Sequence, residues 1–216
     1  MAQLFRPRAN AIVRLVMAAF FATTLIGACF AIALNHSPYL TGVGSTPEQP
    51  VPFSHKHHVG GLGIDCRYCH TSVEQSTFAG LPDTRTCMTC HSQLWTNAEM
   101  LEPVRESLKR DEPLRWQRVH NLADYVYFDH RAHVTNGVGC ESCHGRVDKM
   151  PLTSQRAPLT MQWCLDCHRS PAPHLRGAEA ITAMGHPPPD STTQRQLMQQ
   201  FDIEPERMSE CDVCHR

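Results

Sequence analysis

The stretch Cys66–His70, with the sequence CRYCH, decides the fold of this chain, because its form Cys-x-x-Cys-His recurs four more times. The other copies are Cys87–His91, Cys140–His144, Cys164–His168 and Cys211–His215. This spacing is typical of c-type haem attachment, in which both thiols form thioethers to the haem vinyls and the histidine binds the iron. The motifs therefore predict five covalently attached haem c groups.

Each motif supplies two cysteines and one histidine as predicted cofactor-binding residues. They are Cys66, Cys69, His70, Cys87, Cys90, His91, Cys140, Cys143, His144, Cys164, Cys167, His168, Cys211, Cys214 and His215. The competing interpretation is a set of zinc ribbons, in which paired Cys-x-x-Cys knuckles share a metal. Zinc binding does not require a histidine directly after the second cysteine, whereas all five copies have one. The motifs favour haem over zinc.

The composition agrees with this interpretation. Ten of the eleven cysteines lie in the motifs, so the chain after Cys29 keeps no thiol for a disulfide framework. A formal net charge of −1 gives no sign of a nucleic-acid partner. About 180 residues follow the N-terminal apolar stretch, which is too little protein to build a separate core around each haem. We therefore expect a mostly α protein with extensive coil, wrapped around its cofactors.

Residues 15–34 form a run of 20 residues without a charged side chain, and a helix of that length is ~30 Å long, enough to cross a bilayer. Arg6, Arg8 and Arg14 precede the run, and no lysine or arginine follows before Lys56. The positive-inside rule places residues 1–14 in the cytoplasm. This predicts a single-pass protein of the bacterial inner membrane with its haem domain on the periplasmic side, where covalent haem attachment takes place.

Two alternatives to this anchor stay open. The residues Ala31-Ile32-Ala33 resemble the cleavage site of a signal peptide. The stretch Ile26–Cys29 resembles a lipoprotein signal ahead of a lipidated cysteine, although the apolar run continues past it.

The haem domain, predicted over residues 53–216, follows a proline-rich spacer over residues 35–52. An element of the form Phe-x-His-x-x-His occurs at Phe53–His58 and again at Phe128–His133, each time ahead of two motifs. This repeat predicts the following order: dihaem module 1 (53–91), a helical connector (92–127), dihaem module 2 (128–168) and an extension with the fifth haem (169–216). In the connector, Asn97 is a candidate cap for a helix through Leu108, and Ser191 is a candidate cap in the extension.

Histidines outside the motifs supply candidate second axial ligands, which would keep each iron six-coordinate. The repeated positions predict His55, His58, His130 and His133, and the i, i+3 spacing directs the members of a pair to neighbouring haems. His120 is the candidate for the fifth haem, and Met150 is a competing thioether ligand. The predicted metal ligands are thus His70, His91, His144, His168, His215, His55, His58, His120, His130, His133 and Met150.

The two modules resemble class III cytochromes of the c3 and c7 type. The whole plan, including Arg118–His130 and Leu159–His168, resembles the pentahaem cytochrome subunit of alternative complex III. The resemblance implies a menaquinol-oxidising respiratory complex with integral-membrane and iron–sulfur subunits. Electrons would enter from the iron–sulfur protein and leave to a monohaem cytochrome c or a terminal oxidase. Quinol would then be oxidised on a membrane partner, so that this chain relays electrons without an active site or catalytic residues of its own.

Two other functions compete with the relay. Membrane-anchored multihaem quinol dehydrogenases share the single N-terminal helix, but the proline-rich spacer between residue 34 and Cys66 disfavours contact of the first haem with quinol. A multihaem reductase of nitrite or a similar oxyanion needs an iron with an open position, which a departure from Cys-x-x-Cys-His would indicate. All five motifs are intact.

Overall fold

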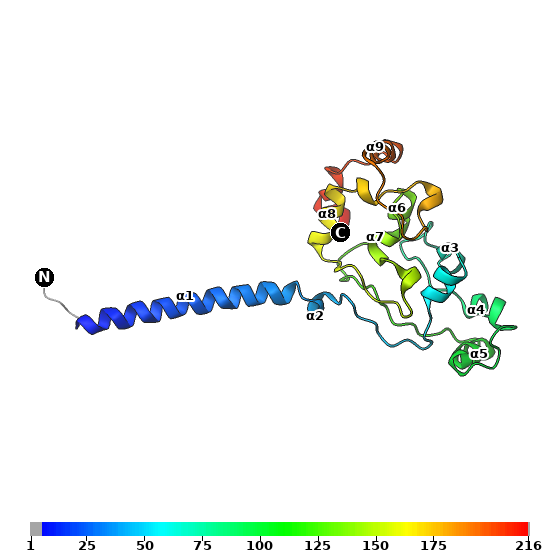
Figure 1. Ribbon diagram of the computed structural model, residues 1–216, viewed down its shortest axis with the longest axis horizontal. Coiled ribbons are helices and arrows are strands. Elements are labelled where there is room, and N and C mark those ends of the chain that lie inside the picture. Colours follow the sequence, from blue (N-terminus) through cyan, green and yellow to red (C-terminus); the bar gives the residue numbers. More distant parts are fainter. Residues whose placement is uncertain (1–5, 216) are drawn as a thin grey trace. The chain divides into compact units, whose positions relative to one another are not determined.

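The computed structural model describes residues 6–215, and Figure 1 shows short helices joined by long irregular segments in the part after residue 42. The chain divides into two compact units, Met1–Gly42 and Val43–Arg216. Over the described residues the β pairing consists of one isolated antiparallel bridge, between Val138 and Leu175. The predicted class, mostly α with extensive coil, is confirmed.

The first unit contains α1 (Pro7–Asn35) and α2 (Pro38–Thr41). Pro7 occupies the first turn of α1, where its missing N–H costs no hydrogen bond. The span Arg8–Asn35 is long and apolar enough to cross a membrane, and its side chains are exposed. The predicted apolar helix over residues 15–34 is therefore present. Of the predicted cytoplasmic segment 1–14, residues 1–5 lie outside the described residues.

The second unit is built from short helices. Its α-helices are α3 (Cys66–Cys69), α4 (Thr84–His91), α5 (Glu102–Arg110), α6 (His130–Thr135), α7 (Glu141–His144), α8 (Met161–Arg169), α9 (Ser191–Gln200) and α10 (Cys211–Cys214). Between them lie the π-helix η1 (Lys56–Gly61) and the 3₁₀ helices η2 (Glu99–Leu101), η3 (Val147–Lys149), η4 (Ala172–His174), η5 (Ala178–Ala180) and η6 (Arg207–Ser209).

The protein's own apolar core is small. Val51, Leu101 and Val104 form a buried cluster, against which the partly buried Cys87 packs. A buried hydrogen bond of 2.7 Å between the hydroxyls of Thr84 and Ser107 joins α4 to α5 beside this cluster. This core fixes the second attachment motif, on α4, to the connector helix α5.

The segment predicted as a spacer is not free of the haem domain. Val51 is 5% exposed and belongs to the core cluster. Gln49 donates to the Gln117 carbonyl and accepts from the Gln117 backbone N–H, both at 2.9 Å. The backbone N–H of Gln155 donates to the Ser45 carbonyl. The prolines make the segment extended, as expected, but it packs as part of the second unit from Val43 onward.

Two predicted helix caps are wrong. The connector helix α5 begins after Leu101, which makes no side-chain cap, because η2 occupies the turn that Asn97 was expected to start. In the extension, the cap of α9 is Asp190, whose carboxylate accepts from the backbone N–H groups of Thr192 and Thr193. A carboxylate also interacts favourably with the positive end of the helix dipole, so Asp190 caps this helix better than Ser191.

Candidate haem-binding sites

Each attachment motif lies on a short helix or at the end of one: α3, α4, α7, α8 and α10. One helical turn brings the two cysteines and the histidine together. In α3, α7 and α10 the backbone N–H of the histidine donates to the backbone carbonyl of the first cysteine. Aspartates cap two of these helices: Asp65 accepts from Arg67 N–H at 2.8 Å, and Asp83 accepts from Arg85 N–H at 2.7 Å. The caps start the helix at or just before the first cysteine.

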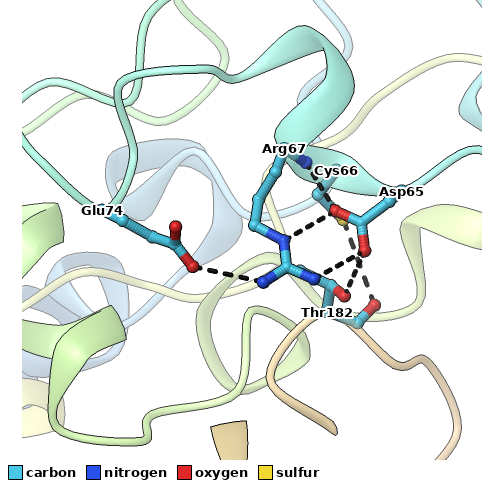
Figure 2. Close-up of polar contacts among 5 residues, drawn as sticks. All are labelled: Asp65, Cys66, Arg67, Glu74 and Thr182. Atoms are coloured by element: carbon cyan, nitrogen blue, oxygen red, sulfur yellow. Dashed lines mark hydrogen bonds and ion pairs between the residues drawn. The ribbon is translucent and has the colours of Figure 1, made fainter. Parts of the chain in front are cut away.

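The first motif is also tied to a distant segment, as Figure 2 shows. The Asp65 carboxylate accepts from the Arg67 guanidinium at 2.9 Å and from the Thr182 hydroxyl at 2.8 Å. Arg67 reaches Glu74 at 3.2 Å, and the Cys66 thiol donates to the Thr182 carbonyl at 4.0 Å. The Arg67 hydrogen bond is the main reason that the pKa of Asp65 falls to about 2. The network thus holds residue 182 against the first attachment cysteine.

Four of the five motif histidines direct Nδ1 to backbone carbonyl oxygens. The acceptors are Gly80 for His70 (2.8 Å), Leu94 for His91 (3.1 Å), Met208 for His168 (2.8 Å) and Tyr125 for His215 (3.1 Å). A carbonyl can only accept, so Nδ1 carries the proton and the Nε2 lone pair is available to a metal. This is the arrangement that orients metal-binding imidazoles in proteins.

The two Phe-x-His-x-x-His elements adopt the same three-ring arrangement. Phe53 stacks on His58 at 4.4 Å and 20° and meets His55 edge-on at 4.9 Å and 85°. In the second copy, Phe128 stacks on His133 at 4.6 Å and 25° and meets His130 edge-on at 4.7 Å and 88°. The repeat seen in the sequence is therefore a repeat of local structure, in which the phenylalanine fixes both imidazoles.

These histidines are oriented in the same way as the motif histidines. Nδ1 of His58 bonds the Ser54 carbonyl at 2.9 Å, and Nδ1 of His133 bonds the Asp129 carbonyl at 2.7 Å. Nδ1 of His130 bonds the Thr77 carbonyl at 2.9 Å, while that of His55 meets the Thr153 hydroxyl at 2.8 Å. Each carbonyl-bound imidazole again leaves its Nε2 lone pair free.

Three of the predicted ligands stand opposite a motif histidine at one common separation. Ring centroids lie 6.2 Å apart for His58 and His91, 6.3 Å for His130 and His144, and 6.0 Å for His133 and His168. With roughly 2 Å for each metal–nitrogen bond, two imidazoles on opposite sides of one ion have ring centres roughly 6 Å apart. The spacing fits axial ligation of an iron by both members of each pair.

The fourth repeated histidine, His55, lies near the first motif. Burial, with smaller contributions from His70 and His58, lowers its pKa to about 4. Each histidine of a Phe-x-His-x-x-His element thus lies near a motif histidine of its own module. In the first module His55 is near His70 and His58 is opposite His91. This is the pairing expected for histidines three residues apart on one short element.

His120 lies beside the third motif. Its ring is 4.5 Å from that of His144 at 73°, and its Nε2 is buried without a hydrogen-bond partner. Burial lowers the pKa of His144 to about 3, with further contributions from His120 and His130. A buried imidazole nitrogen without a partner is costly in protein alone. His215 of the fifth motif meets Tyr125, at 5.9 Å between ring centroids.

Met150 is a core residue, 9% exposed, whose sulfur accepts from the Ser154 hydroxyl at 3.7 Å. That contact gives no support to its prediction as an axial ligand. Within residues 6–215, no group of three or more histidine, cysteine or acidic side chains is arranged to hold a metal ion. A zinc ribbon needs four such ligands around one ion. The thiol pairs followed by single oriented imidazoles therefore fit haem, whose porphyrin supplies the other ligands.

Several groups of the site carry no signal in the sequence. The carbonyls of Gly80, Thr77 and Met208 orient three imidazoles, but any residue type can supply a backbone oxygen. Phe53 and Phe128 belong to the repeat that the sequence displays, and that repetition is the signal that could have assigned them a positioning role.

No known protein-family profile matches the chain. A curated relative from Nitratidesulfovibrio vulgaris strain Hildenborough, named the multiheme cytochrome c subunit of menaquinone reductase, is 41% identical over 101 residues. The match covers 46% of this chain and 47% of the relative, so the chain spans about half the length of the curated relative that it matches. The chain is similar to a multihaem cytochrome c over that part.

Proposed function

We propose that this protein is a membrane-anchored pentahaem cytochrome c that relays electrons in a menaquinone-linked respiratory complex. The observation that carries the proposal is the set of three histidine pairs at 6.0–6.3 Å, each joining a Cys-x-x-Cys-His motif to a repeated histidine. Haem c supplies one-electron chemistry through its iron, and two imidazole ligands keep that iron low-spin and closed to substrates. The relative's name supports the link to menaquinone.

The chain's own residues have three roles in this proposal. The ten motif cysteines attach the cofactors and the five motif histidines bind the irons. His55, His58, His130 and His133 complete the coordination of four of them. Phe53 and Phe128 hold these second ligands in place by ring contact. All of these groups serve to attach, ligate or position haem in this proposal. We therefore assign quinone chemistry to a partner subunit.

We further propose that the complex is of the alternative complex III type, oxidising menaquinol and passing electrons from an iron–sulfur subunit to a monohaem cytochrome or a terminal oxidase. The plan of one N-terminal helix followed by five motifs supports this assignment. The second candidate is a complex that reduces menaquinone, since the relative is named for that direction. Oxidation of quinol on this chain itself is a third possibility.

One purification tests these assignments. The full-length chain is expressed in its native host and purified from the membrane in mild detergent. Mass spectrometry gives the intact mass of the haem-loaded chain and identifies the subunits that co-purify with it. We expect five haems, an iron–sulfur protein and integral-membrane partners. Recovery of a lone haem-loaded chain that oxidises a menaquinol analogue would favour the quinol dehydrogenase. Zinc in place of haem would refute the whole proposal.

A further inference from the structure

We propose that the relay does not follow the order of the sequence: the attachment motifs are arranged in space as second, first, third, fourth and fifth. This inference rests on the proposed function and extends it. It makes Cys87–His91 and Cys211–His215 the two ends of the relay and places Cys66–His70 in its interior. An electron accepted from a one-electron donor at one end is then passed to a one-electron acceptor at the other. The protein returns to its starting oxidation state after each passage.

The second motif contacts the first. The hydroxyl of Tyr68, inside the first motif, lies 3.0 Å from the hydroxyl of Thr89, inside the second. His58, which follows His55 on the first repeat, stands opposite His91.

The first motif contacts the third through residues 181 and 182. The Ile181 carbonyl accepts from the backbone N–H of Cys140 at 3.0 Å, and the Thr182 hydroxyl donates to the carboxylate of Asp65, which directly precedes Cys66, at 2.8 Å. The Thr182 carbonyl lies 4.0 Å from the Cys66 sulfur. Two adjacent residues thus hold the first cysteines of both motifs.

The third motif is joined to the fourth by α6. His130 and His133 lie one turn apart on this helix, and they face His144 at 6.3 Å and His168 at 6.0 Å. Two irons whose second ligands leave the same helical turn must be neighbours.

The fourth motif is joined to the fifth by the segment that leads into α10. Nδ1 of His168 bonds the carbonyl of Met208 at 2.8 Å. Met208 lies in η6, which packs against α8 and ends two residues before Cys211.

A relay in sequence order would require a contact between the second and third motifs. Within residues 6–215, no hydrogen bond, ion pair or ring contact joins Cys87–His91 to Cys140–His144. Figure 1 shows the helices of the second, first, third and fourth motifs, α4, α3, α7 and α8, in this order across the second unit. Exposure gives independent support: of the ten motif cysteines, only Cys90 and Cys211 are exposed, and they belong to the two proposed end motifs. External donors and acceptors need such accessible ends.

The test uses the full-length, haem-loaded protein in detergent. In the fully reduced state, low-spin irons are diamagnetic, and nuclear Overhauser effects between haem substituents report neighbouring haems. We expect cross-peaks between haems 1 and 2, 1 and 3, 3 and 4, and 4 and 5. A cross-peak between haems 2 and 3, together with none between 1 and 3, would overturn the order. Intact mass counts the haems first: fewer than five would contradict the proposed function rather than the order.

A matched pair of variants gives a second, independent readout. Replacing a second histidine ligand by methionine raises the potential of that haem, so that it can be reduced while the others stay oxidised. In His55→Met, reduction of the haem at the first motif (haem 1) should remove its magnetic coupling to two neighbouring oxidised haems. In His58→Met, reduction of the haem at the second motif (haem 2) should remove its coupling to one. Electron paramagnetic resonance at poised potentials measures the number of haems whose signal changes. The opposite pattern, two neighbours for haem 2 and one for haem 1, would restore sequence order.

Discussion

The rings of His58 and His91 lie 6.2 Å apart and face one another at 66°, although His58 belongs to η1 and His91 ends α4. Both imidazoles are held through Nδ1, by the carbonyls of Ser54 and Leu94. Backbone carbonyls therefore fix the orientation of both rings, and the separation is the one that two axial ligands of a single iron require.

This relationship predicts the effect of His58→Ala. We expect one of the five haems to lose its second imidazole and to become high-spin, because His58 is the histidine that stands opposite His91. Near-infrared magnetic circular dichroism counts bis-histidine haems directly. His57→Ala is the matched control: His57 is exposed beside His58, with its ring 5.7 Å from Trp95, and its loss should leave the spin state of every haem unchanged. Identical spectra for both variants would contradict the assignment.

The third motif offers two candidate ligands, and the geometry chooses between them. His130 faces His144 at 6.3 Å with nearly parallel rings, whereas His120 at 4.5 Å leaves too little room for an iron between the rings. We expect His130→Ala to open the haem at the third motif, seen as a high-spin signal and as carbon monoxide binding to the reduced protein. His120→Ala should leave that haem closed. If His120→Ala opens it instead, the assignment to His130 is wrong.

Asp65 should stabilise the protein in a pH-dependent way. Its carboxylate caps α3 and binds both Arg67 and Thr182, and the Arg67 hydrogen bond is the main reason that its pKa is lowered from 3.8 to about 2. The charged form is therefore favoured by folding, and this contribution is present above pH 4 and disappears as the pH falls through about 2. For a half-exposed cap, Asp65→Ala should cost roughly 0.5–2 kcal/mol at neutral pH.

Unfolding in guanidinium at neutral pH and at acid pH measures this difference. The exposed Asp124 is the control, since Asp124→Ala removes a carboxylate without a hydrogen bond or ion pair among the described residues. An Asp65→Ala penalty that persists unchanged at pH 2 would show that the cap does not depend on the charge.

Local features of this structure were predictable from the sequence, and long-range ones were not. The motif spacing and the Phe-x-His-x-x-His repeat act within a few residues, so they predicted histidines that the structure places opposite one another, such as His58 and His91. The order of the motifs depends instead on pairs such as Cys66 and Thr182, which are 116 residues apart. Such contacts leave no periodic pattern. The packing of Val51 into the core was missed for the same reason.

Gly60 marks a place where the first repeat is packed too closely for a side chain. A Cβ at this position would overlap the carbonyl oxygen of Asp148, which lies in η3, whereas one at Gly61 would meet its nearest atom at 3.8 Å. We expect Gly60→Ala to push η1 from η3 and to destabilise the protein by roughly 1–3 kcal/mol. Gly61→Ala should cost far less. Comparable unfolding midpoints for the two variants would contradict this account of the contact.

The arginines at the N-terminal end of α1 should control on which side of the membrane the haems are attached. Arg6, Arg8 and Arg14 are the basic residues among the described positions before the uncharged run 15–34, and cytoplasmic flanks of membrane helices carry such an excess. Because the attachment machinery acts outside the cytoplasm, Arg8→Glu combined with Arg14→Glu should lower the fraction of chains that carry haem. Haem-stained gels of the membrane fraction, normalised to the total amount of chain, measure this fraction.

Exposed arginines of the haem domain provide the control. Arg85→Glu combined with Arg207→Glu should leave haem loading unchanged, since both residues lie far along the chain from the span. Equal loading of the two double variants would mean that the basic flank does not set the orientation.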